Sequence, residues 1–210
     1  IPSWKIAPAL ICGNTVVFKP ATSTPLSGIN LVSLFEEAGL PPGVLNIITG
    51  PGSAIGDTLV THPMVKGVSF TGSTDTGSRL YSMGARQLKK VQAEMGGKNA
   101  VIVLSDADIE KALTAVVEGA FGSTGQRCTA TSRLIIEDAI YDNFISALID
   151  MTKKLRIGYG LLPGIDIGPA SSEEQLEQIL RYIELGKVEG ATLAYGGNRI
   201  TGAEFDQGFY

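Results

Sequence analysis

The residues that offer the clearest chemistry surround one cysteine. Cys128 lies in the stretch GSTGQRCTATSR (122–133), among small polar residues and directly after Arg127. A positive charge or the N-terminus of a helix favours the thiolate, which is the nucleophilic form of cysteine. A helix that begins near Thr124 or Gly125 would therefore assist Arg127. The pattern makes Cys128 a candidate nucleophile.

The second cysteine has a different setting. Cys12 lies in the apolar stretch PALICGNTV. A free cysteine is more often a small buried hydrophobic residue than a nucleophile. We expect Cys12 to be buried in this way.

A nucleophilic cysteine needs a base, and histidine is its usual partner. The chain has one histidine, His62, in the stretch THPMV, where the following proline predicts a loop and a structural role. This disfavours a papain-like protease. A carboxylate is the better candidate, and Glu94 has the most unusual surroundings because it precedes MGGKN. The two glycines indicate either a close approach of another group to the backbone or an ordinary tight turn.

Three strand ends carry residues suited to a phosphate-containing ligand. Lys19 closes the first apolar run, TGPGSAIG (49–56) follows the second, and FTGSTDTG (70–77) includes the end of the third. In open α/β sheets, ligands bind beyond the carboxyl ends of the strands, where helix N-termini present free N–H groups. The spacing G-x-G-x-x-x-G departs from the Rossmann fingerprint and recurs in GYGLLPG (158–164). Ordinary turns therefore stay open as an alternative, as does a solvated lysine at position 19.

Strand-like and helix-like segments alternate along the chain. Short apolar runs predict strands, and apolar residues three or four apart between capping and stop signals predict helices. This alternation is typical of an α/β fold with parallel sheets and right-handed crossovers. The predicted strands are 14–20, 43–49, 67–71, 89–95, 99–104, 133–137 and 191–197. The predicted helices run from Thr24 to Gly39, from the glycine-rich turn 50–56 to about Thr61, from Ser73 to Met83, from Asp106 or Asp108 to Gly119, over 140–155 and over 171–190. In the last of these, Ser172 and Gln175 are placed as a capping box.

The composition disfavours several classes of partner. The 210 residues are 44% hydrophobic and 18% charged, with a formal net charge of −4, so a packed core is expected. No basic run marks a nucleic-acid surface, and no run approaches the roughly 18 apolar residues of a membrane span. Two distant cysteines without a CxxC motif predict neither a metal site nor a disulfide framework, and they favour the cytoplasm.

Six stretches, taken in order, resemble the aldehyde dehydrogenase superfamily across essentially the whole chain. The resemblance implies a parallel-sheet, Rossmann-like cofactor domain followed by part of an α/β catalytic domain. Residues 1–95 would form most of the NAD(P)-binding domain and residues 96–210 the first part of the catalytic domain, so we expect an internal portion of a longer chain. The stretches are WKIAPALICGNTVVFKPATSTPL, EEAGLPPGVLNIITG, SFTGSTDTG, EMGGKNAVIVLSDADIEKA, GQRCTATSRLIIEDAIYDNF and DIGPASSEEQLEQILRYI.

The resemblance also implies a reaction, the oxidation of an aldehyde to a carboxylic acid with NAD or NADP. Cys128 would attack the aldehyde to give a thiohemiacetal, and hydride transfer to the nicotinamide would leave a thioester. Glu94 would activate the water that releases the acid. Covalent capture divides one difficult step into two easier ones. The family stabilises the oxyanion with the cysteine N–H and with an asparagine that is expected upstream of Ile1, and a ribose-binding glutamate is expected beyond Tyr210.

The same resemblance assigns residues to the cofactor. Lys19 would bind the adenosine ribose, Gly52 would let the backbone approach the cofactor, and Ser73 would contact the pyrophosphate. Gly72 and Gly96 belong to the same predicted set.

One cofactor-binding position departs from a common family pattern. Many NAD-preferring members carry glutamate three residues after the lysine, where its carboxylate binds the ribose hydroxyls and repels a 2′-phosphate. Here Thr22 occupies that position. We therefore expect NADP to be accepted.

The sequences of three motifs suggest a substrate class. STGQRCTATSRLI, EMGGKN and APALICGNTVVFKP resemble the bacterial ketoglutarate semialdehyde dehydrogenase branch. Arg127 could pair with a substrate carboxylate, or it could be structural to its own loop. By analogy, the full-length protein would be a homo-oligomer, either a dimer or a tetramer. The alternatives are a thioester-forming hydrolase or acyltransferase without redox chemistry, and a non-catalytic fragment of the fold.

Overall fold

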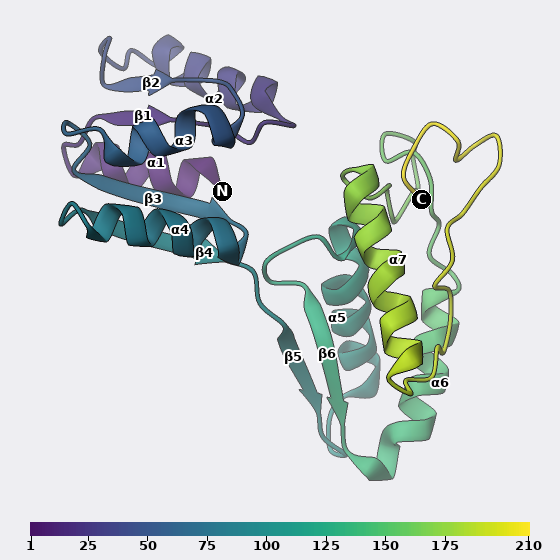
Figure 1. The fold of residues 1–210 in the computed structure, drawn as a ribbon. Helices are drawn as coiled ribbons and strands as arrows, with labels where there is room; N and C mark the ends of the chain where they lie inside the picture. Colours follow the sequence, from purple (N-terminus) through teal and green to yellow (C-terminus); the bar gives the residue numbers. More distant parts are fainter. The chain divides into compact units, whose positions relative to one another are not determined.

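A computed structural model describes all 210 residues, which form two compact units, Ile1–Gly96 and Gly97–Tyr210 (Figure 1). Helices and strands alternate in both units, and all three strand pairs are parallel. This confirms the predicted α/β class. No helix is both long enough and apolar enough to cross a membrane.

The first unit holds two parallel strand pairs, β1 with β2 and β3 with β4, each connected by a crossover helix. In a parallel pair the carboxyl ends of both strands lie at the same edge. Most of the residues predicted to bind the cofactor lie at or just after these strand ends. The elements are α1 (Pro2–Ile11), β1 (Val16–Phe18), α2 (Pro25–Glu37), β2 (Leu45–Ile47), α3 (Gly52–Thr61), β3 (Gly67–Gly72), α4 (Thr74–Ala85) and β4 (Lys90–Met95).

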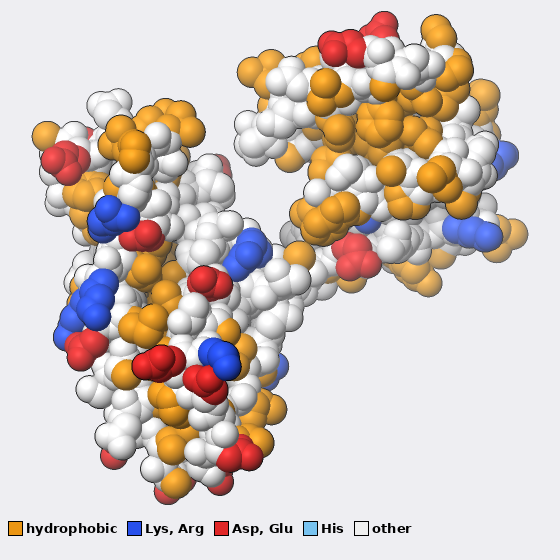
Figure 2. Space-filling view, turned by 180° about the vertical axis from the view of Figure 1, so that it is seen from behind, with side chains coloured by type: hydrophobic (Ala, Val, Ile, Leu, Met, Phe, Trp, Pro, Cys, Tyr) orange, Lys and Arg blue, Asp and Glu red, His pale blue; other side chains and the backbone are white.

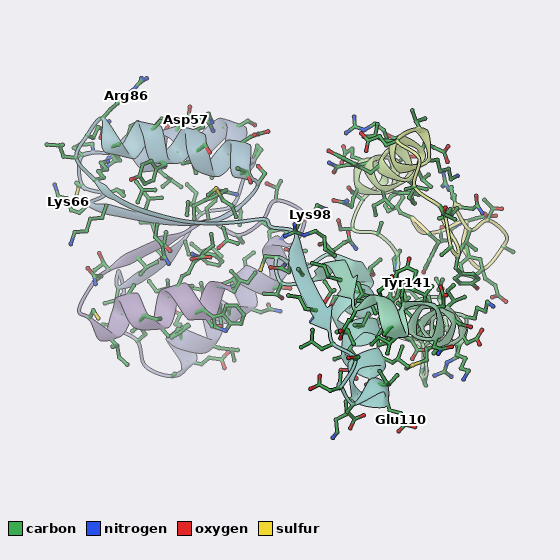
Figure 3. All side chains as sticks on the ribbon, turned by 90° about the horizontal axis from the view of Figure 1, so that it is seen from below. Asp57, Lys66, Arg86, Lys98, Glu110 and Tyr141 are labelled. Carbon is green, nitrogen blue, oxygen red and sulfur yellow. The ribbon has the colours of Figure 1, made fainter.

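Glycines bring α4 close to β4. A Cβ placed on Gly77 would lie 2.6 Å from the sulfur of Met95, and a Cβ on Gly84 would overlap Val91. The two glycines are seven residues apart, so they share one face of the helix. Arg79 on the same helix donates to Asp57 of α3 at 2.5 Å (Asp57 is labelled in Figure 3). These contacts hold α4 against β4 and against α3.

The second unit is built on the parallel pair β5 and β6, and α5 and α6 pack on it. Its core consists of Val103, Leu113, Val116 and Phe144, of which Phe144 is 1% exposed. The elements are β5 (Asn99–Val103), α5 (Ile109–Phe121), the short 3₁₀ segments η1 (Gly122–Gly125) and η2 (Asp138–Ile140), β6 (Thr131–Ile136), α6 (Tyr141–Thr152) and α7 (Glu173–Val188).

Helix α1 was not predicted, and it contains two prolines. Pro2 occupies the first turn, where its missing N–H costs nothing, whereas Pro8 lies inside the helix. Tertiary contacts compensate for Pro8: Ile6 is 2% exposed, and the Lys5 ammonium donates to Ser69 Oγ at 2.8 Å and to the Phe70 carbonyl at 3.2 Å. The helix is therefore held against β3 by long-range contacts that local rules do not detect.

One predicted strand is wrong. Residues 191–197 form no strand, because a strand needs a hydrogen-bonded neighbour and this segment pairs with none. Gly196 and Gly197 also have positive φ angles of 70° and 82°, which interrupt an extended chain.

Two predicted helix caps differ in detail. Thr24 is the N-cap of α2, but its side chain makes no capping hydrogen bond. Ser172 caps α7 by accepting from the N–H of Gln175 at 3.2 Å, while the reciprocal bond of a capping box is absent. The helix starts are thus predicted correctly from residue type, and the side-chain geometry is only partly as expected.

Hydrophobic side chains also lie on the surface. Figure 2 shows them over much of the visible face of the first unit. Trp4, Ile11 and Leu26 are 75%, 89% and 72% exposed. Apolar surface of this extent is characteristic of proteins that pack against further protein surface.

Candidate functional site

Lys19 links the chain segments that leave β1 and β2. Its ammonium donates to the carbonyl of Pro20 at 2.7 Å and to the carbonyl of Gly50 at 3.3 Å. An ammonium has three N–H donors, so one is left after these two bonds. Lys19 is half-buried and tied to the backbone rather than freely solvated. The freely solvated alternative is therefore wrong for this lysine.

The N-terminus of α3 lies directly after that link. Its N-cap residue, Pro51, provides no side-chain acceptor, so the first N–H groups of the helix have no cap. A Cβ on Gly52 would meet no atom within 4 Å, so the glycine leaves open space over the backbone. Gly50 has a φ of 147°, which glycine adopts most readily. Uncapped N–H groups beside open backbone suit an anionic group such as a phosphate.

The start of α4 is occupied by contacts within the chain itself. Ser73 caps the helix: its Oγ accepts from the Thr76 N–H at 3.3 Å and lies 3.0 Å from Thr76 Oγ1. A Cβ on Gly72 would overlap the ring of Phe70. Both residue types therefore have a structural explanation, and their contact with a cofactor stays a prediction.

Two further predicted cofactor residues are accessible. Thr22 is exposed in the segment between β1 and α2. Gly96 follows β4, is exposed, and has no atom within 4 Å of the position of a Cβ.

Glu94 lies near the end of β4, opposite Thr71 of β3, and is exposed. Its Oε1 accepts from Gln92 Nε2 at 3.3 Å, and Gln92 Oε1 accepts from Ser69 Oγ at 2.9 Å. Ser69 in turn accepts from Lys5 at 2.8 Å. Every donor in this chain of hydrogen bonds points towards the carboxylate. It runs from an ammonium on α1 to Glu94 and orients the carboxylate.

Lys5, Ser69 and Gln92 were not among the predicted site residues. One signal for Gln92 was available: residues two apart on a strand share a face, so Gln92 and Glu94 must be neighbours. Lys5 and Ser69 are 64 residues apart, and no local pattern connects them.

Cys128 is exposed and lies in the turn between η1 and β6. No helix begins at Thr124 or Gly125, so that expectation is wrong. Instead Ser123, Thr124 and Gly125 have φ angles of 53°, 59° and 65°, three consecutive residues in the left-handed region. Such a conformation costs about 1–3 kcal/mol for each non-glycine residue. The approach to Cys128 is therefore a strained turn that must be held by its surroundings.

Part of that support comes from the segment 168–171. Thr124 Oγ1 donates to the Gly168 carbonyl at 3.2 Å, and Gln126 Oε1 accepts from the Ser171 N–H at 3.0 Å. A Cβ on Gly125 would lie 2.7 Å from the Ala120 carbonyl oxygen, so only glycine fits at that point.

Arg127 is engaged by its own loop. Its Nη2 donates to the Glu118 carbonyl at 3.0 Å, and the Gly122 N–H bonds to the same carbonyl at the end of α5. The guanidinium thus helps to close the helix. This contact explains the arginine by a structural role, and pairing with a substrate carboxylate stays a prediction.

The other thiol and the histidine lie in the first unit. Cys12 is exposed at the end of α1, so the expectation that it is buried is wrong. His62 is the C-cap residue of α3, and its Nδ1 accepts from the Met64 N–H at 3.3 Å. Of the predicted site residues, only Arg127 and Cys128 lie in the second unit.

A family model described as "Aldehyde dehydrogenase family" matches residues 1–210, which is the whole chain. Among curated proteins, the chain is 49% identical over 210 residues to an alpha-ketoglutaric semialdehyde dehydrogenase of Bacillus subtilis, covering 100% of this chain and 43% of that protein. It is 49% identical to a 2,5-dioxopentanoate dehydrogenase of Saccharolobus solfataricus, covering 96% of this chain and 42% of that protein. The chain thus spans less than half the length of these relatives.

Solved structures resemble the chain closely. HpcC from Thermus thermophilus superposes with a TM-score of 0.95 at 42% identity, covering 99% of this chain and 41% of that one. A betaine aldehyde dehydrogenase from Staphylococcus aureus in complex with NAD+ gives a TM-score of 0.96 at 40% identity, covering 100% of this chain and 42% of that one.

Proposed function

Because the chain belongs to the aldehyde dehydrogenase family, we propose that it carries the nucleophile, the base and much of the cofactor site of an enzyme that oxidises an aldehyde to a carboxylic acid with NAD(P)+. The observation that carries the proposal is the family match over all 210 residues, and the exposure of Cys128 shortly after the strained residues 123–125 supports it. Strained backbone that the surroundings hold in place is a common feature of active sites.

Cys128 is the nucleophile in this proposal. Its sulfur attacks the aldehyde carbon, a C–S bond forms, and the carbonyl oxygen becomes the oxyanion of a thiohemiacetal. The exposure of Cys128 and the small residues around it leave room for a substrate carbonyl. Loss of hydride from the former aldehyde carbon then leaves a thioester on the same sulfur.

Glu94 is the base that activates water against that thioester. A general base must be ionised and directed at the proton it removes. The chain of donors from Lys5 through Ser69 and Gln92 supports this role, because it limits the rotation of the carboxylate. Attack by the activated water breaks the C–S bond, releases the acid and regenerates the thiol.

The edge of the first unit fits a dinucleotide. The open backbone at Gly52 and the uncapped N-terminus of α3 suit its phosphates, and the free N–H of Lys19 suits a ribose hydroxyl. Bound NAD(P)+ supplies the hydride acceptor that the oxidation requires. The full set of residues assigned to it is Lys19, Thr22, Gly52, Gly72, Ser73 and Gly96. In this assignment residues 1–95 contribute the cofactor domain and residues 96–210 the first part of the catalytic domain.

We assign a semialdehyde with a carboxylate at its far end as the substrate class. Two relatives, each 49% identical to the chain, are named for one such compound, called alpha-ketoglutaric semialdehyde in one name and 2,5-dioxopentanoate in the other. Arg127 is the cation nearest in sequence to the nucleophile. Its guanidinium has five N–H donors, and the bond to Glu118 uses one of them.

The assembly and the compartment are part of the same proposal. By analogy with the family, the complete protein is a homo-oligomer, a dimer or a tetramer. Two free thiols are in keeping with a reducing compartment such as the cytoplasm.

The test is the formation of reduced nicotinamide over a panel of aldehydes with and without a second carboxylate, with NAD and with NADP. Cys128→Ser should abolish the signal, and Cys12→Ser, which removes the other exposed thiol, should retain it. Arg127→Ala should lower the efficiency for carboxylated aldehydes selectively. Ester cleavage without any cofactor reduction would instead assign the protein to a hydrolase or acyltransferase.

A further inference from the structure

The side chain of Asn99 connects β5 to the turn that carries Cys128, residues 127–130. Asn99 Nδ2 donates to the carbonyl of Cys128 at 2.8 Å and to the carbonyl of Ala130 at 3.1 Å. Asn99 opens β5, and its partners lie 29 and 31 residues later in the chain. A single amide therefore holds the residue that carries the thiol and the last residue before β6.

The amide of Asn99 is suited to this pair of bonds. Both partners are carbonyl oxygens, which accept hydrogen bonds and cannot donate them. An –NH₂ group has two donors, so it can serve both oxygens. Aspartate has almost the same shape but only acceptors at neutral pH, so it would place its oxygens against both carbonyls.

The bonds fix the peptide planes on either side of the turn. The Ala130 N–H donates to the Arg127 carbonyl at 3.0 Å, which orients the peptide that contains the Cys128 N–H. Asn99 orients the next peptide through the Cys128 carbonyl. The Cys128 N–H donates to no acceptor within the chain, so it stays free beside the exposed thiol.

We propose that Asn99 is a positioning residue, whose amide holds the Cys128 peptide so that the thiol and the free N–H act together on one carbonyl group. The inference rests on the proposed role of Cys128 as a nucleophile towards carbonyl carbon. Residues 168–171 hold the left-handed segment before Cys128, through Thr124 and Gln126, and Asn99 holds Cys128 itself. An N–H that stabilises an oxyanion is effective only when it is held in place beforehand.

Two reactions of the Cys128 thiol distinguish a thiol that is positioned beside an oxyanion donor from a thiol that is only exposed to solvent. In acylation by p-nitrophenyl acetate, the sulfur attacks the carbonyl carbon, an oxyanion forms, and p-nitrophenolate leaves with the electron pair of the broken bond. In alkylation by iodoacetamide, the sulfur displaces iodide and no oxyanion forms. The fraction of thiolate enters both rates equally, so the ratio of the two rate constants reports the carbonyl-specific part.

The comparison uses the whole 210-residue chain with one thiol at a time. In the Cys12→Ser chain only Cys128 reacts, and in the Cys128→Ser chain only Cys12 reacts, which is an exposed thiol without the tie. We expect the acylation-to-alkylation ratio of Cys128 to exceed that of Cys12 by about tenfold or more, since an oxyanion donor contributes about 10²–10³ in a complete site. Equal ratios for the two thiols would overturn the proposal.

The substitution then tests Asn99 itself in the Cys12→Ser background. Asn99→Asp and Asn99→Ala should lower the ratio for Cys128 by about tenfold, while the alkylation rate changes by less than about threefold. The matched control is Arg133→Met: Arg133 Nε donates to the Lys98 carbonyl at 3.0 Å, a tie between the same two strand ends that does not touch the turn (Lys98 is labelled in Figure 3). The control should keep the parental ratio.

Each outcome is decisive. An unchanged ratio in both Asn99 variants would show that the amide only stabilises the fold, and an equal fall in Arg133→Met would attribute the effect to the strand pair as a whole. If Asn99→Asp does not fold, as judged by circular dichroism, Asn99→Ala and the comparison with Cys12 carry the test. Neither reaction involves nicotinamide, so the positioning role can hold or fail independently of the dehydrogenase activity.

Discussion

The side-chain amide of Gln92 donates to the carboxylate of Glu94 across 3.3 Å, between two residues that share one face of β4. The other end of the same amide accepts from Ser69 at 2.9 Å, so the orientation of the amide is set by β3. The carboxylate proposed as the base is therefore held through the pairing of two strands.

Replacing Gln92 by leucine keeps the side-chain volume and removes the donor. Without it Glu94 rotates more freely, and the water-dependent step should slow by about fivefold, which corresponds to the roughly 1 kcal/mol of an ordinary hydrogen bond. Hydride transfer in the first turnover does not use Glu94 and should change by less than about twofold. Rapid-mixing measurements of reduced nicotinamide would show a retained first-turnover burst followed by a slower steady state.

The control for this variant is Lys90→Leu, on the same face of β4 two residues earlier. It adds the same side chain without removing a bond to Glu94. A burst and a steady state that slow together in Gln92→Leu would contradict the role of the amide.

Thr22→Glu should shift the cofactor preference from NADP towards NAD. Thr22 is exposed three residues after Lys19, so a carboxylate there can approach the ribose of a bound cofactor and repel a 2′-phosphate. We expect the ratio of kcat/KM with NADP to that with NAD to fall by about tenfold or more. Ser23→Glu adds the same charge at the adjacent exposed position and should change the ratio much less. An unchanged ratio in Thr22→Glu would falsify the assignment of this residue.

Gly28→Ala and Gly56→Ala should change stability in opposite directions. A Cβ on Gly28 would lie 2.7 Å from Pro20 Cβ and 3.1 Å from the ring of Phe18, so α2 would be pushed from the end of β1. Overpacking of this kind costs about 1–3 kcal/mol. A Cβ on Gly56 would meet nothing within 4 Å, and alanine in a helix is favoured over glycine by about 1 kcal/mol or less. Urea unfolding of the two variants measures both changes, and equal effects would contradict the packing described here.

The stabilising contribution of the Asp166 carboxylate should be lost in acid. Its Oδ2 accepts from the backbone N–H of Arg156 at 2.8 Å and from the side chain of Arg156 at 3.4 Å. The backbone bond, with a smaller contribution from the guanidinium, holds the pKa of Asp166 below its ordinary value of 3.8. A carboxyl group with a lower pKa in the folded state stabilises that state above its ordinary pKa, and the contribution is lost as the pH falls through the folded-state value.

The free energy of unfolding should therefore decrease more steeply below about pH 4 in the parent protein than in Asp166→Asn, which keeps an acceptor but does not titrate. Denaturant unfolding between pH 6 and pH 3 would measure both slopes. Parallel slopes would exclude a contribution of this carboxylate.

Much of the fold was predictable because its signals are local. Apolar runs and helical spacing identified β1 to β6 and six of the seven α-helices. Residue types at helix starts placed Ser172 as an N-cap and offered Asp106 or Asp108 as another, of which the structure shows Asp108. Helix α1 and the missing strand at 191–197 were not predictable in this way. Burial of Ile6 and the contacts of Lys5 decide the first, and the lack of a pairing partner decides the second.

The sequence by itself determined which residues can do chemistry. Cys128 and Glu94 became candidates through their types and neighbours together with the family resemblance, because nucleophilicity and basicity belong to the side chains themselves. Only the tertiary structure decided how these groups are held. A left-handed turn stands in place of a helix start before Cys128. The Asn99 amide donates to the Cys128 carbonyl, and the Gln92 amide donates to the Glu94 carboxylate. The ties to the Cys128 turn join residues 29 to 45 positions apart, and a hydrogen bond depends on distance and direction in space, which spacing along the chain does not specify.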